Sequence, residues 1–562
     1  MSKTTSHIAF PEGSCIHDLF ETQVAQKPDH PALVFEGRSL SYRQLSKKSN
    51  QLARHLLKLG LRPGDHVAIC LERSMEMFIG LLGIIKAGAA YCPIDPTYPA
   101  ARQTFMLQDT EAKLLLTQSS LLTQLQPLAG DVPVICLDTD WPAIAEQKKS
   151  TPPVGLEDHH LIYTIFTSGS TGQPKGVQVE HRNVANLIEG QLNFVQHPVQ
   201  RFLYAYSFAF DGSVLLIWWT LLQGATLVIG PEGLEKDVQQ LATFVESHQV
   251  SHLLTFPSVY SILLEKATTH QLRFLESVSV AGEACPGALV QQHHRLLPNC
   301  CLLNQYGPTE ATVGCTIHIT DPQHEGPKVP IGRPINNCEI YLLDDQLNPV
   351  PDGDTGEIFI GGRPVARGYL NRPELTRQRF LNNTFTSAFA KWDANRMYRT
   401  GDLARRLPDG QIDFIGRVDH QVKLRGYRIE LGEVEAAVLA HPFVREAAVS
   451  VFGESPTDQK LVAHIVLQQG EELSTSDLRN FLATQLPEYM VPASYVQLDR
   501  MPLSPSGKVD RKNLPQPSRE RPALQQEYVA PQTALEKYIA TLWCEMLELD
   551  RVGIHDKFFE LG

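Results

Sequence analysis

Residues 163–177, with the sequence YTIFTSGSTGQPKGV, are the most informative stretch of this 562-residue chain. An apolar run typical of a buried strand leads into a loop rich in hydroxyl side chains, with Gly169 and Gly172, and then Lys175. Glycine lets the backbone approach an anion closely, and hydroxyl and N–H groups can bind phosphate oxygens. The spacing is not that of GxxxxGK[ST], because Pro174 stands where the second glycine would be. We therefore predict a phosphate-binding loop of another kind, with an ordinary surface loop as the alternative.

Short apolar strands alternate with amphipathic helical stretches on both sides of this loop. One helix is expected from a cap at Ser41 to Gly60, followed by a strand at 66–70 and a helix at 74–87. Further strands are expected at 161–166, 202–206, 225–229, 251–256 and 276–282. This alternation predicts an α/β protein whose large N-terminal domain contains parallel sheets covered by helices.

The pattern changes from about residue 328, where strands follow one another with short connections. We expect a small β-barrel-like part there, completing a large domain over residues 1–418. A smaller, mobile α+β domain is expected at 419–512, followed by a Pro- and Gln-rich linker at 513–530. The remainder, 531–562, contains one amphipathic helix and ends abruptly.

Composition excludes several classes of protein. The formal charge of −12, from 50 basic and 62 acidic residues, disfavours sequence-independent binding to nucleic acid or to an anionic membrane. The longest apolar run, 213–222, is too short to span a bilayer, and the N-terminus has no apolar signal core. The ten cysteines are scattered without zinc-ligand spacing, which favours a reducing, cytoplasmic location.

The 163–177 loop resembles the phosphate loop of the adenylate-forming enzymes, which include acyl-CoA synthetases, luciferases and the adenylation domains of nonribosomal peptide synthetases. The resemblance extends to about residue 512, and its later motifs are closest to those of peptide synthetases. The other matching segments, in the family's order, are LSYRQL (40–45), KAGAAYCPIDPTYP (86–99), FDGS (210–213), NQYGPTE (304–310), GEIFIGGRPVARGYLNRPELT (356–376), YRTGDL (398–403), GRVDHQVKLRGYRIELGEVE (416–435), LPEYMVP (486–492) and PLSPSGKVDR (502–511).

The resemblance implies ATP and Mg²⁺ as cofactors and three catalytic residues. Lys508 would swing into the site and bridge the substrate carboxylate and the α-phosphate, where a mobile ammonium offsets the repulsion of two anions. Thr309 would bind the α-phosphate, and Glu310 would hold Mg²⁺, a cation that prefers carboxylate and phosphate oxygens. Asp419 would be the hinge about which the small domain rotates, so that the following segment lines a pantetheine tunnel.

The remaining nucleotide contacts are implied in the same way. Asp402 would accept hydrogen bonds from both ribose hydroxyls, and Arg417 would lie near the ribose and phosphates. Tyr306 would stack on adenine, and Gly282 would let its backbone approach the base. The implied ATP site comprises Thr167, Ser168, Gly169, Ser170, Thr171, Gly172, Lys175, Gly282, Tyr306, Gly307, Thr309, Asp402, Arg417 and Lys508.

Asp211 in the FDGS motif distinguishes the subclasses, because peptide-synthetase relatives use this aspartate to pair with the α-ammonium of an amino acid. The implied substrate pocket comprises Asp211, Gly212, Leu215, Thr255, Ser279, Ala281, Gln305, Val313 and Gly314. The side-chain-facing residues are uncharged and several are small, which predicts a roomy cavity for a large neutral side chain. Tyrosine or phenylalanine is expected, with glutamine as a weaker candidate, and Thr255 and Gln305 are expected to bind a polar tip.

The expected product is aminoacyl-AMP, whose acyl group passes to a phosphopantetheine thiol on a peptidyl carrier domain. Residues 528–562 resemble the first helix of such a domain, and the chain stops at Gly562, before the serine that carries the cofactor. We therefore expect an incomplete carrier domain that cannot be loaded in cis, and partners that include downstream synthetase modules. A small activating partner protein and a position as an initiation module stay open. The alternatives are an acyl-CoA synthetase that uses free CoA and an inactive assembly-line scaffold.

Overall fold

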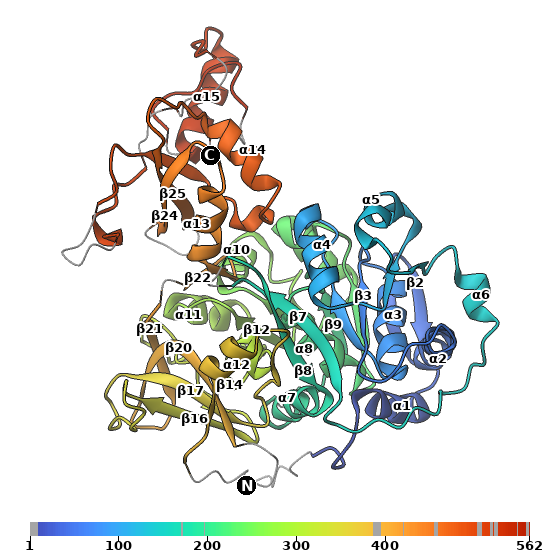
Figure 1. Cartoon of the computed structure of the whole chain (residues 1–562). Helices are drawn as coiled ribbons and strands as arrows, with labels where there is room; N and C mark the ends of the chain where they lie inside the picture. Colours follow the sequence, from blue (N-terminus) through green and yellow to red (C-terminus); the bar gives the residue numbers. More distant parts are fainter. Residues whose placement is uncertain are drawn as a thin grey trace. The chain divides into compact units, whose positions relative to one another are not determined.

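The computed structural model forms two compact units (Figure 1). It describes residues 9–169, 172–195, 197–385, 395–419, 421–453, 459–502, 509–517, 521, 527–547, 549–557 and 561. The larger unit comprises Met1–Pro96, Gln103–Thr167 and Lys175–Asp419, and the smaller unit comprises Thr97–Arg102, Ser168–Pro174 and His420–Gly562.

Two mixed sheets form the centre of the larger unit. In the described part of the chain, one has the order β18 (Gly368–Tyr369), β8 (Lys175–Glu180), β7 (Leu161–Thr167), β4 (Ala90–Pro93), β3 (His66–Ile69), β5 (Leu114–Thr117) and β6 (Val134–Cys136). The other has the order β15 (Arg333–Pro334), β14 (Thr316–Ile319), β13 (Cys301–Tyr306), β12 (Ser277–Ala281), β11 (His252–Thr255), β9 (Arg201–Tyr204), β10 (Thr226–Ile229), β1 (Pro31–Phe35) and β2 (Arg38–Ser41).

The β-rich part of this unit is a separate antiparallel sheet. Its strands are β16 (Cys338–Leu343), β17 (Gly356–Gly362), β20 (Arg396–Arg406) and β19 (Phe380–Asn382), with β21 (Ile412–Arg417) also paired to β20. The β20–β21 register places Asp402 opposite Arg417. A pairing between neighbouring strands, rather than sequence proximity, therefore brings together two residues of the implied nucleotide site.

Helices cover the sheets, and two of them are buried within the core. The helices are α1 (Ile16–Gln26), α2 (Tyr42–Lys58), α3 (Met75–Lys86), α4 (Ala100–Asp109), α5 (Ser119–Ala129), α6 (Trp141–Ala145), α7 (His181–Phe194), α8 (Gly212–Leu221), α9 (Val238–Ser247), α10 (Pro257–Lys266), α11 (Gly287–Leu296) and α12 (Pro373–Arg379). All residues of α3 except Glu76, and all of α8, are buried, as expected for helices that are apolar on every side. The apolar run at 213–222 is thus a core helix, and no described helix is long and apolar enough to cross a bilayer.

The α/β class is confirmed, and the sheets that were expected to be parallel are mixed. Strands β3, β4, β5 and β6, and β9 to β13, pair in parallel, whereas β7 and β8 are antiparallel. The connection at 168–174 is too short for a parallel crossover, which needs about a dozen residues. The predicted phosphate loop therefore lies at the tip of a β-hairpin.

The smaller unit has an α+β fold of its own. Its hairpin, β22 (Gln421–Leu424) and β23 (Tyr427–Glu430), precedes a sheet of β24 (Val444–Phe452), β25 (Lys460–Leu467) and β26 (Ser494–Gln497). Helices α13 (Leu431–Leu439) and α14 (Thr475–Ala483) contribute to one apolar core with these strands. Helix α15 (Ala534–Leu547) has no buried residue, and Leu535, Ile539 and Leu542 are exposed, so the apolar face of this amphipathic helix is uncovered.

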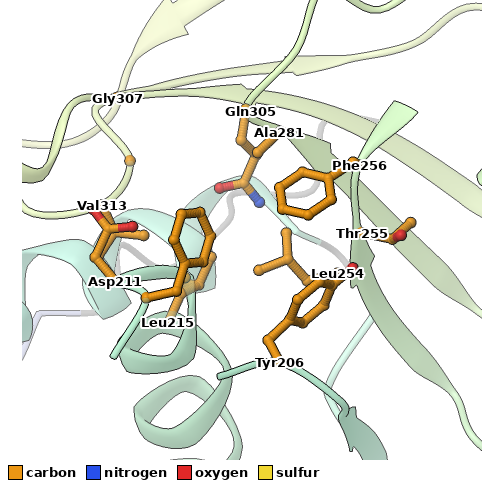
Figure 2. A pocket seen from close by; sticks show the side chains of 14 residues that line it. Tyr206, Asp211, Leu215, Leu254, Thr255, Phe256, Ala281, Gln305, Gly307 and Val313 are labelled. Carbon is orange, nitrogen blue, oxygen red and sulfur yellow. The ribbon is translucent and has the colours of Figure 1, made fainter. Parts of the chain in front are cut away.

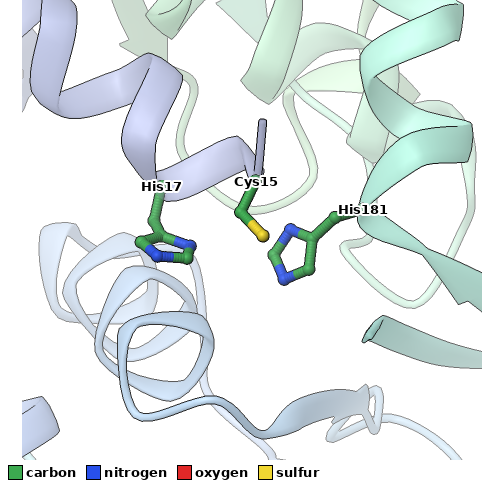
Figure 3. A group of neighbouring side chains, drawn as sticks. All are labelled: Cys15, His17 and His181. Atoms are coloured by element: carbon green, nitrogen blue, oxygen red, sulfur yellow. The ribbon is translucent and has the colours of Figure 1, made fainter. Parts of the chain in front are cut away.

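Three buried side chains meet where α1 begins beside α7 (Figure 3). One ligand-type atom from each of Cys15, His17 and His181 lies within 4.8 Å of the others. The Ile16 N–H donates to His181 Nδ1 over 3.2 Å, and burial lowers the pKa of His181 well below its ordinary value. Burial also raises the pKa of Cys15 to about 12. We assign these groups a structural role, because the neutral His181 ring already accepts the N–H that begins α1.

Candidate active site

A cavity of the larger unit opens between the ends of several strands and the start of α8 (Figure 2). It holds about 600 Å³ of empty space, part of which is open to solvent. Apolar and aromatic side chains form most of its described wall. The lining residues are Tyr206, Phe210, Asp211, Gly212, Leu215, Leu254, Thr255, Phe256, Ala281, Gly282, Gln305, Gly307, Val313 and Gly314.

The implied substrate positions coincide with this cavity except at one residue. Asp211, Gly212, Leu215, Thr255, Ala281, Gln305, Val313 and Gly314 all line it. Ser279 is not among the lining residues, and its hydroxyl accepts a hydrogen bond from Nε2 of the lining residue Gln305 over 3.0 Å. The substrate-binding role expected for Ser279 stays a prediction, and the contact that the structure shows for its hydroxyl is with Gln305.

Sequence reasoning missed an aromatic wall. The Phe256 ring lies with its centroid 5.5 Å from that of Tyr206 and 6.0 Å from that of Phe210, both edge to face. The sequence places these aromatic residues next to predicted site residues, since Phe210 immediately precedes Asp211 and Phe256 follows the end of β11. This proximity was not enough to predict the wall, because only the folded loops show which aromatic rings face the cavity.

Thr255 and Gln305, which were expected to bind a polar tip, both line the cavity, but their polar groups are directed elsewhere. Leu254 and Thr255 are consecutive in β11 and point to opposite sides, so Thr255 is turned away from the aromatic wall in Figure 2. The Thr255 hydroxyl is buried without a hydrogen-bond partner. The Gln305 amide is bound by Gln191 and Ser279. The described wall therefore suits an apolar side chain better than a polar tip.

Asp211 places a carboxylate at this cavity. It lies at the start of α8, where the helix dipole favours negative charge, and is 9% exposed. Thr309 Oγ1 donates a hydrogen bond to Asp211 Oδ2 over 2.6 Å. The residue expected to bind the substrate ammonium and the residue expected to bind the α-phosphate are therefore in direct contact.

Backbone strain shapes the wall beside Asp211 (Figure 2). Thr312 and Val313 follow the short helix η2 (Thr309–Ala311) with φ values of 55° and 68°. This left-handed conformation is unfavourable for β-branched residues and is typical of functional sites. It accompanies a tight turn in which a Cβ on Gly307 would lie 2.6 Å from the Val313 carbonyl oxygen. Glycine is thus required at position 307, and Val313 lines the cavity.

The implied ribose and base residues form a second cluster in the same unit. Tyr306 donates its hydroxyl proton to Asp402 Oδ2 over 2.5 Å, and Arg417 donates to Asp402 Oδ1. Burial, with Asp402 close by, raises the pKa of Tyr306 well above its ordinary value, so that the phenol stays protonated. Arg417 also binds Asp419 through Nε and a terminal nitrogen, over 2.7 and 2.8 Å. One guanidinium thus joins the predicted ribose acceptor and the predicted hinge.

Gly401 allows this arrangement, and its role was not foreseen. Its φ is +78°, and a Cβ there would lie 2.9 Å from an Arg417 terminal nitrogen and 3.0 Å from Asp419 Oδ2. The TGD motif pointed to Asp402 alone. The glycine before the aspartate could have indicated a close contact at this position. The contacting guanidinium, however, comes from β21 through sheet pairing, which the motif does not reveal.

Glu310, the predicted magnesium ligand, is fully buried. It accepts a hydrogen bond from the Tyr369 hydroxyl over 2.7 Å and lies 3.4 Å from Lys175 Nζ. An anionic oxygen on this carboxylate fits the ligand preference of Mg²⁺. Lys175, expected at the phosphates, is therefore adjacent to the predicted metal ligand.

The beginning of the phosphate loop belongs to the smaller unit. Ser168 Oγ donates to the Arg428 carbonyl over 2.8 Å, and the Gly169 N–H donates to Glu433 Oε2 over 2.9 Å. The Gly169 amide thus binds a carboxylate oxygen of the protein, and its contact with a phosphate stays a prediction. Gly172 has a φ of +83°. Thr167 is the last residue of β7, with its hydroxyl buried and unpartnered, whereas Ser170, Thr171 and Lys508 lie outside the described residues.

The fold and these two clusters define an adenylate-forming enzyme. Residues 20–370 match the AMP-binding enzyme family, and residues 433–508 match the AMP-binding enzyme C-terminal domain. The chain therefore belongs to the AMP-binding enzyme family, and the recognition made from its motifs is confirmed.

Individual relatives are peptide synthases. The chain is 44% identical over 561 residues to a linear gramicidin synthase from Brevibacillus parabrevis, covering 99% of this chain and 7% of that protein. It is 41% identical over 563 residues to gramicidin S synthase 2 of Brevibacillus brevis, covering 99% and 12%. The chain thus spans about a tenth of the length of these relatives.

A solved structure resembles nearly the whole chain. It is that of a holo NRPS protein containing adenylation and PCP domains, bound to a vinylsulfonamide inhibitor. It has a TM-score of 0.82 and 27% identity, over 98% of this chain and 90% of that one.

Proposed function

We propose that this chain activates an α-amino acid with a large, neutral and mainly apolar side chain as aminoacyl-AMP. One observation carries the proposal: the Asp211 carboxylate lies at the cavity and is bonded to Thr309 over 2.6 Å. A carboxylate there can bind an α-ammonium, while the adjacent Thr309 can bind the phosphate that the amino-acid carboxylate attacks. The aromatic wall favours phenylalanine over tyrosine, because the polar groups expected at the side-chain tip are turned away or already bound.

The nucleotide would be held by the second cluster. Asp402 offers two carboxylate oxygens for ribose hydroxyls once Tyr306 gives up its hydrogen bond and presents its ring to adenine. Arg417 supplies a permanent positive charge near the phosphates. Mg²⁺, held by Glu310 and phosphate oxygens, would neutralise charge on the triphosphate as the carboxylate attacks. Lys508 keeps the catalytic role that the family resemblance implies.

The proposed acceptor of the acyl group is a phosphopantetheine thiol on a peptidyl carrier domain. The similarity to an NRPS protein with adenylation and PCP domains and to gramicidin synthases supports this, as does the exposed apolar face of α15. We further propose that the chain acts with other synthetase modules in the biosynthesis of a peptide secondary metabolite. Asp211 disfavours an acyl-CoA synthetase, whose acyl substrates carry no ammonium to pair with it.

ATP–pyrophosphate exchange with a panel of amino acids tests the proposal. We expect exchange that depends on a large neutral amino acid, with phenylalanine among the best substrates. Asp211→Asn removes the negative charge and should lower kcat/KM for that amino acid about 100- to 10,000-fold, as expected when one partner of a buried ion pair is lost. For a desamino analogue of the same amino acid, the Asp211→Asn change should lower kcat/KM only slightly.

Asp237→Asn is a matched control, because Asp237 also begins a helix and caps it through the Gln239 and Gln240 amides. Asparagine is an equally good cap, so exchange should be unchanged. Wild-type preference for a carboxylic acid without an amino group would contradict the amino-acid assignment. A separately supplied, pantetheinylated carrier should accept the acyl group, and its failure to do so would contradict the transfer step alone.

A further inference from the structure

Gln305 is the one neutral amide in the described cavity wall, and its hydrogen-bonding groups are directed to other protein side chains. Gln305 Oε1 accepts from Gln191 Nε2 over 3.0 Å, while Gln305 Nε2 donates to Gln191 Oε1 over 3.1 Å. A third bond, of 3.0 Å, runs from Gln305 Nε2 to Ser279 Oγ. Both N–H groups of the Gln305 amide are therefore used within the protein.

Gln191 itself is completely buried and does not line the cavity. It lies on α7, whereas Gln305 is in β13 and Ser279 in β12. The amide pair therefore joins a helix to the sheet that forms the cavity wall. In Figure 2 the Gln305 side chain is drawn next to Ala281, above Leu254 and Tyr206.

We propose that Gln191 is a positioning residue for substrate selection, which acts by holding the Gln305 amide away from the substrate side chain. The inference rests on the proposed amino-acid activation and extends it. An unbound Gln305 amide would be a buried polar group that requires a partner, and a polar substrate side chain would supply one. With Gln191 present, the amide is satisfied, and the wall favours an apolar substrate.

The test compares exchange kinetics with L-phenylalanine, L-tyrosine and L-glutamine in single and double variants. Gln191→Leu keeps the volume of the side chain but removes two of the three hydrogen bonds of Gln305. We expect kcat/KM for phenylalanine to fall about tenfold, mainly through KM, and the ratio of polar to apolar substrates to rise by a similar factor, the size of one lost hydrogen bond.

The double variant Gln191→Leu/Gln305→Leu makes the test specific. Replacing both partners of a buried hydrogen bond by apolar groups of similar shape is nearly neutral. The double variant should therefore recover phenylalanine activity to within about threefold of wild type and discriminate further against glutamine. A strictly additive double variant would show that the two amides are not coupled and would overturn the proposal.

Asn186→Ala is the matched control, since Asn186 is another fully buried amide on α7 that bonds to Asn336 and Asn337, away from the cavity. It should lower the melting temperature without changing the substrate ratio. An equal ratio change in Asn186→Ala and Gln191→Leu would mean a general loss of packing and overturn the inference. If the wild type supports no amino-acid-dependent exchange, the proposed function itself is wrong. If the wild type supports exchange but Gln191→Leu keeps the wild-type ratio of polar to apolar substrates, only the role proposed for Gln191 is wrong.

Discussion

Single residues at the cavity act through the space that they leave as much as through their chemistry. Gly212 and Gly314 were both expected to enlarge the pocket, and both line it. Their surroundings differ, however. A Cβ on Gly212 would meet Phe210 at 3.1 Å, whereas one on Gly314 would meet Gln305 Oε1 at 3.4 Å, which is ordinary contact.

Gly314→Ala should therefore fold normally and shift the substrate preference, because the added methyl group takes space from the cavity. We expect phenylalanine to lose about three- to tenfold in kcat/KM relative to leucine, as the burial of one to two methylene equivalents is worth about 1 kcal/mol. Competition between the two amino acids in the exchange assay measures this. Gly212→Ala should instead move the Phe210 ring and impair both substrates, and an unchanged preference in Gly314→Ala would contradict the assignment of this wall to the side chain.

At the scale of elements, the nucleotide cluster depends on the pairing of β20 with β21. That register sets Arg417 opposite Asp402, and Gly401 leaves room for the guanidinium and for Asp419. Gly410, in the turn between the same strands, has a similar φ of +85°, but its Cβ would have only Arg333 nearby, at 3.9 Å. A comparison of variants at Gly401 and Gly410 therefore distinguishes the effect of backbone strain from the effect of a contact with Arg417 and Asp419.

Gly401→Ala should raise KM for ATP about tenfold or more, whereas Gly410→Ala should leave it within about twofold. Both variants share the cost of a left-handed alanine, roughly 1–2 kcal/mol of unfolding free energy. Only the first displaces Arg417. ATP titration in the exchange assay, together with urea unfolding, checks both parts. Equal KM values in the two variants would show that Gly401 acts on stability alone.

At the scale of the whole molecule, buried neutral histidines link stability to pH. His293 accepts the Tyr260 hydroxyl proton at Nδ1 over 2.6 Å, and its Nε2 donates to the Cys300 carbonyl over 2.8 Å. Burial lowers the pKa of His293 from 6.5 to about 4, and burial lowers that of His252 to about 4 as well. Both rings belong to the sheet-and-helix core of the larger unit, so their protonation opposes its folding.

The unfolding free energy should therefore fall as the pH decreases from 6.5 to about 4. In that window the unfolded chain binds protons that the folded chain excludes, so stability is complete above 6.5 and is lost on acidification, by up to about 3 kcal/mol per histidine. Urea unfolding at pH 7, 6 and 5 measures the slope. His293→Gln should flatten it, because the variant no longer carries the buried ring that resists protonation. Equal slopes for wild type and His293→Gln would contradict this origin of acid sensitivity.

The sequence by itself determined the α/β class, the adenylate-forming family and most positions of the cavity wall. Local patterns and ordered motifs encode these, as in the helix capped by Ser41 and the FDGS segment that contains Asp211. Only the tertiary structure decided the antiparallel hairpin under the phosphate loop, the contact of Gly401 with Arg417 and the direction of Thr255. It also revealed the amide pair of Gln191 and Gln305, residues 114 positions apart in the chain. Which strands pair, and which face of a strand meets a cavity, depends on long-range packing that periodicity and motif spacing do not specify.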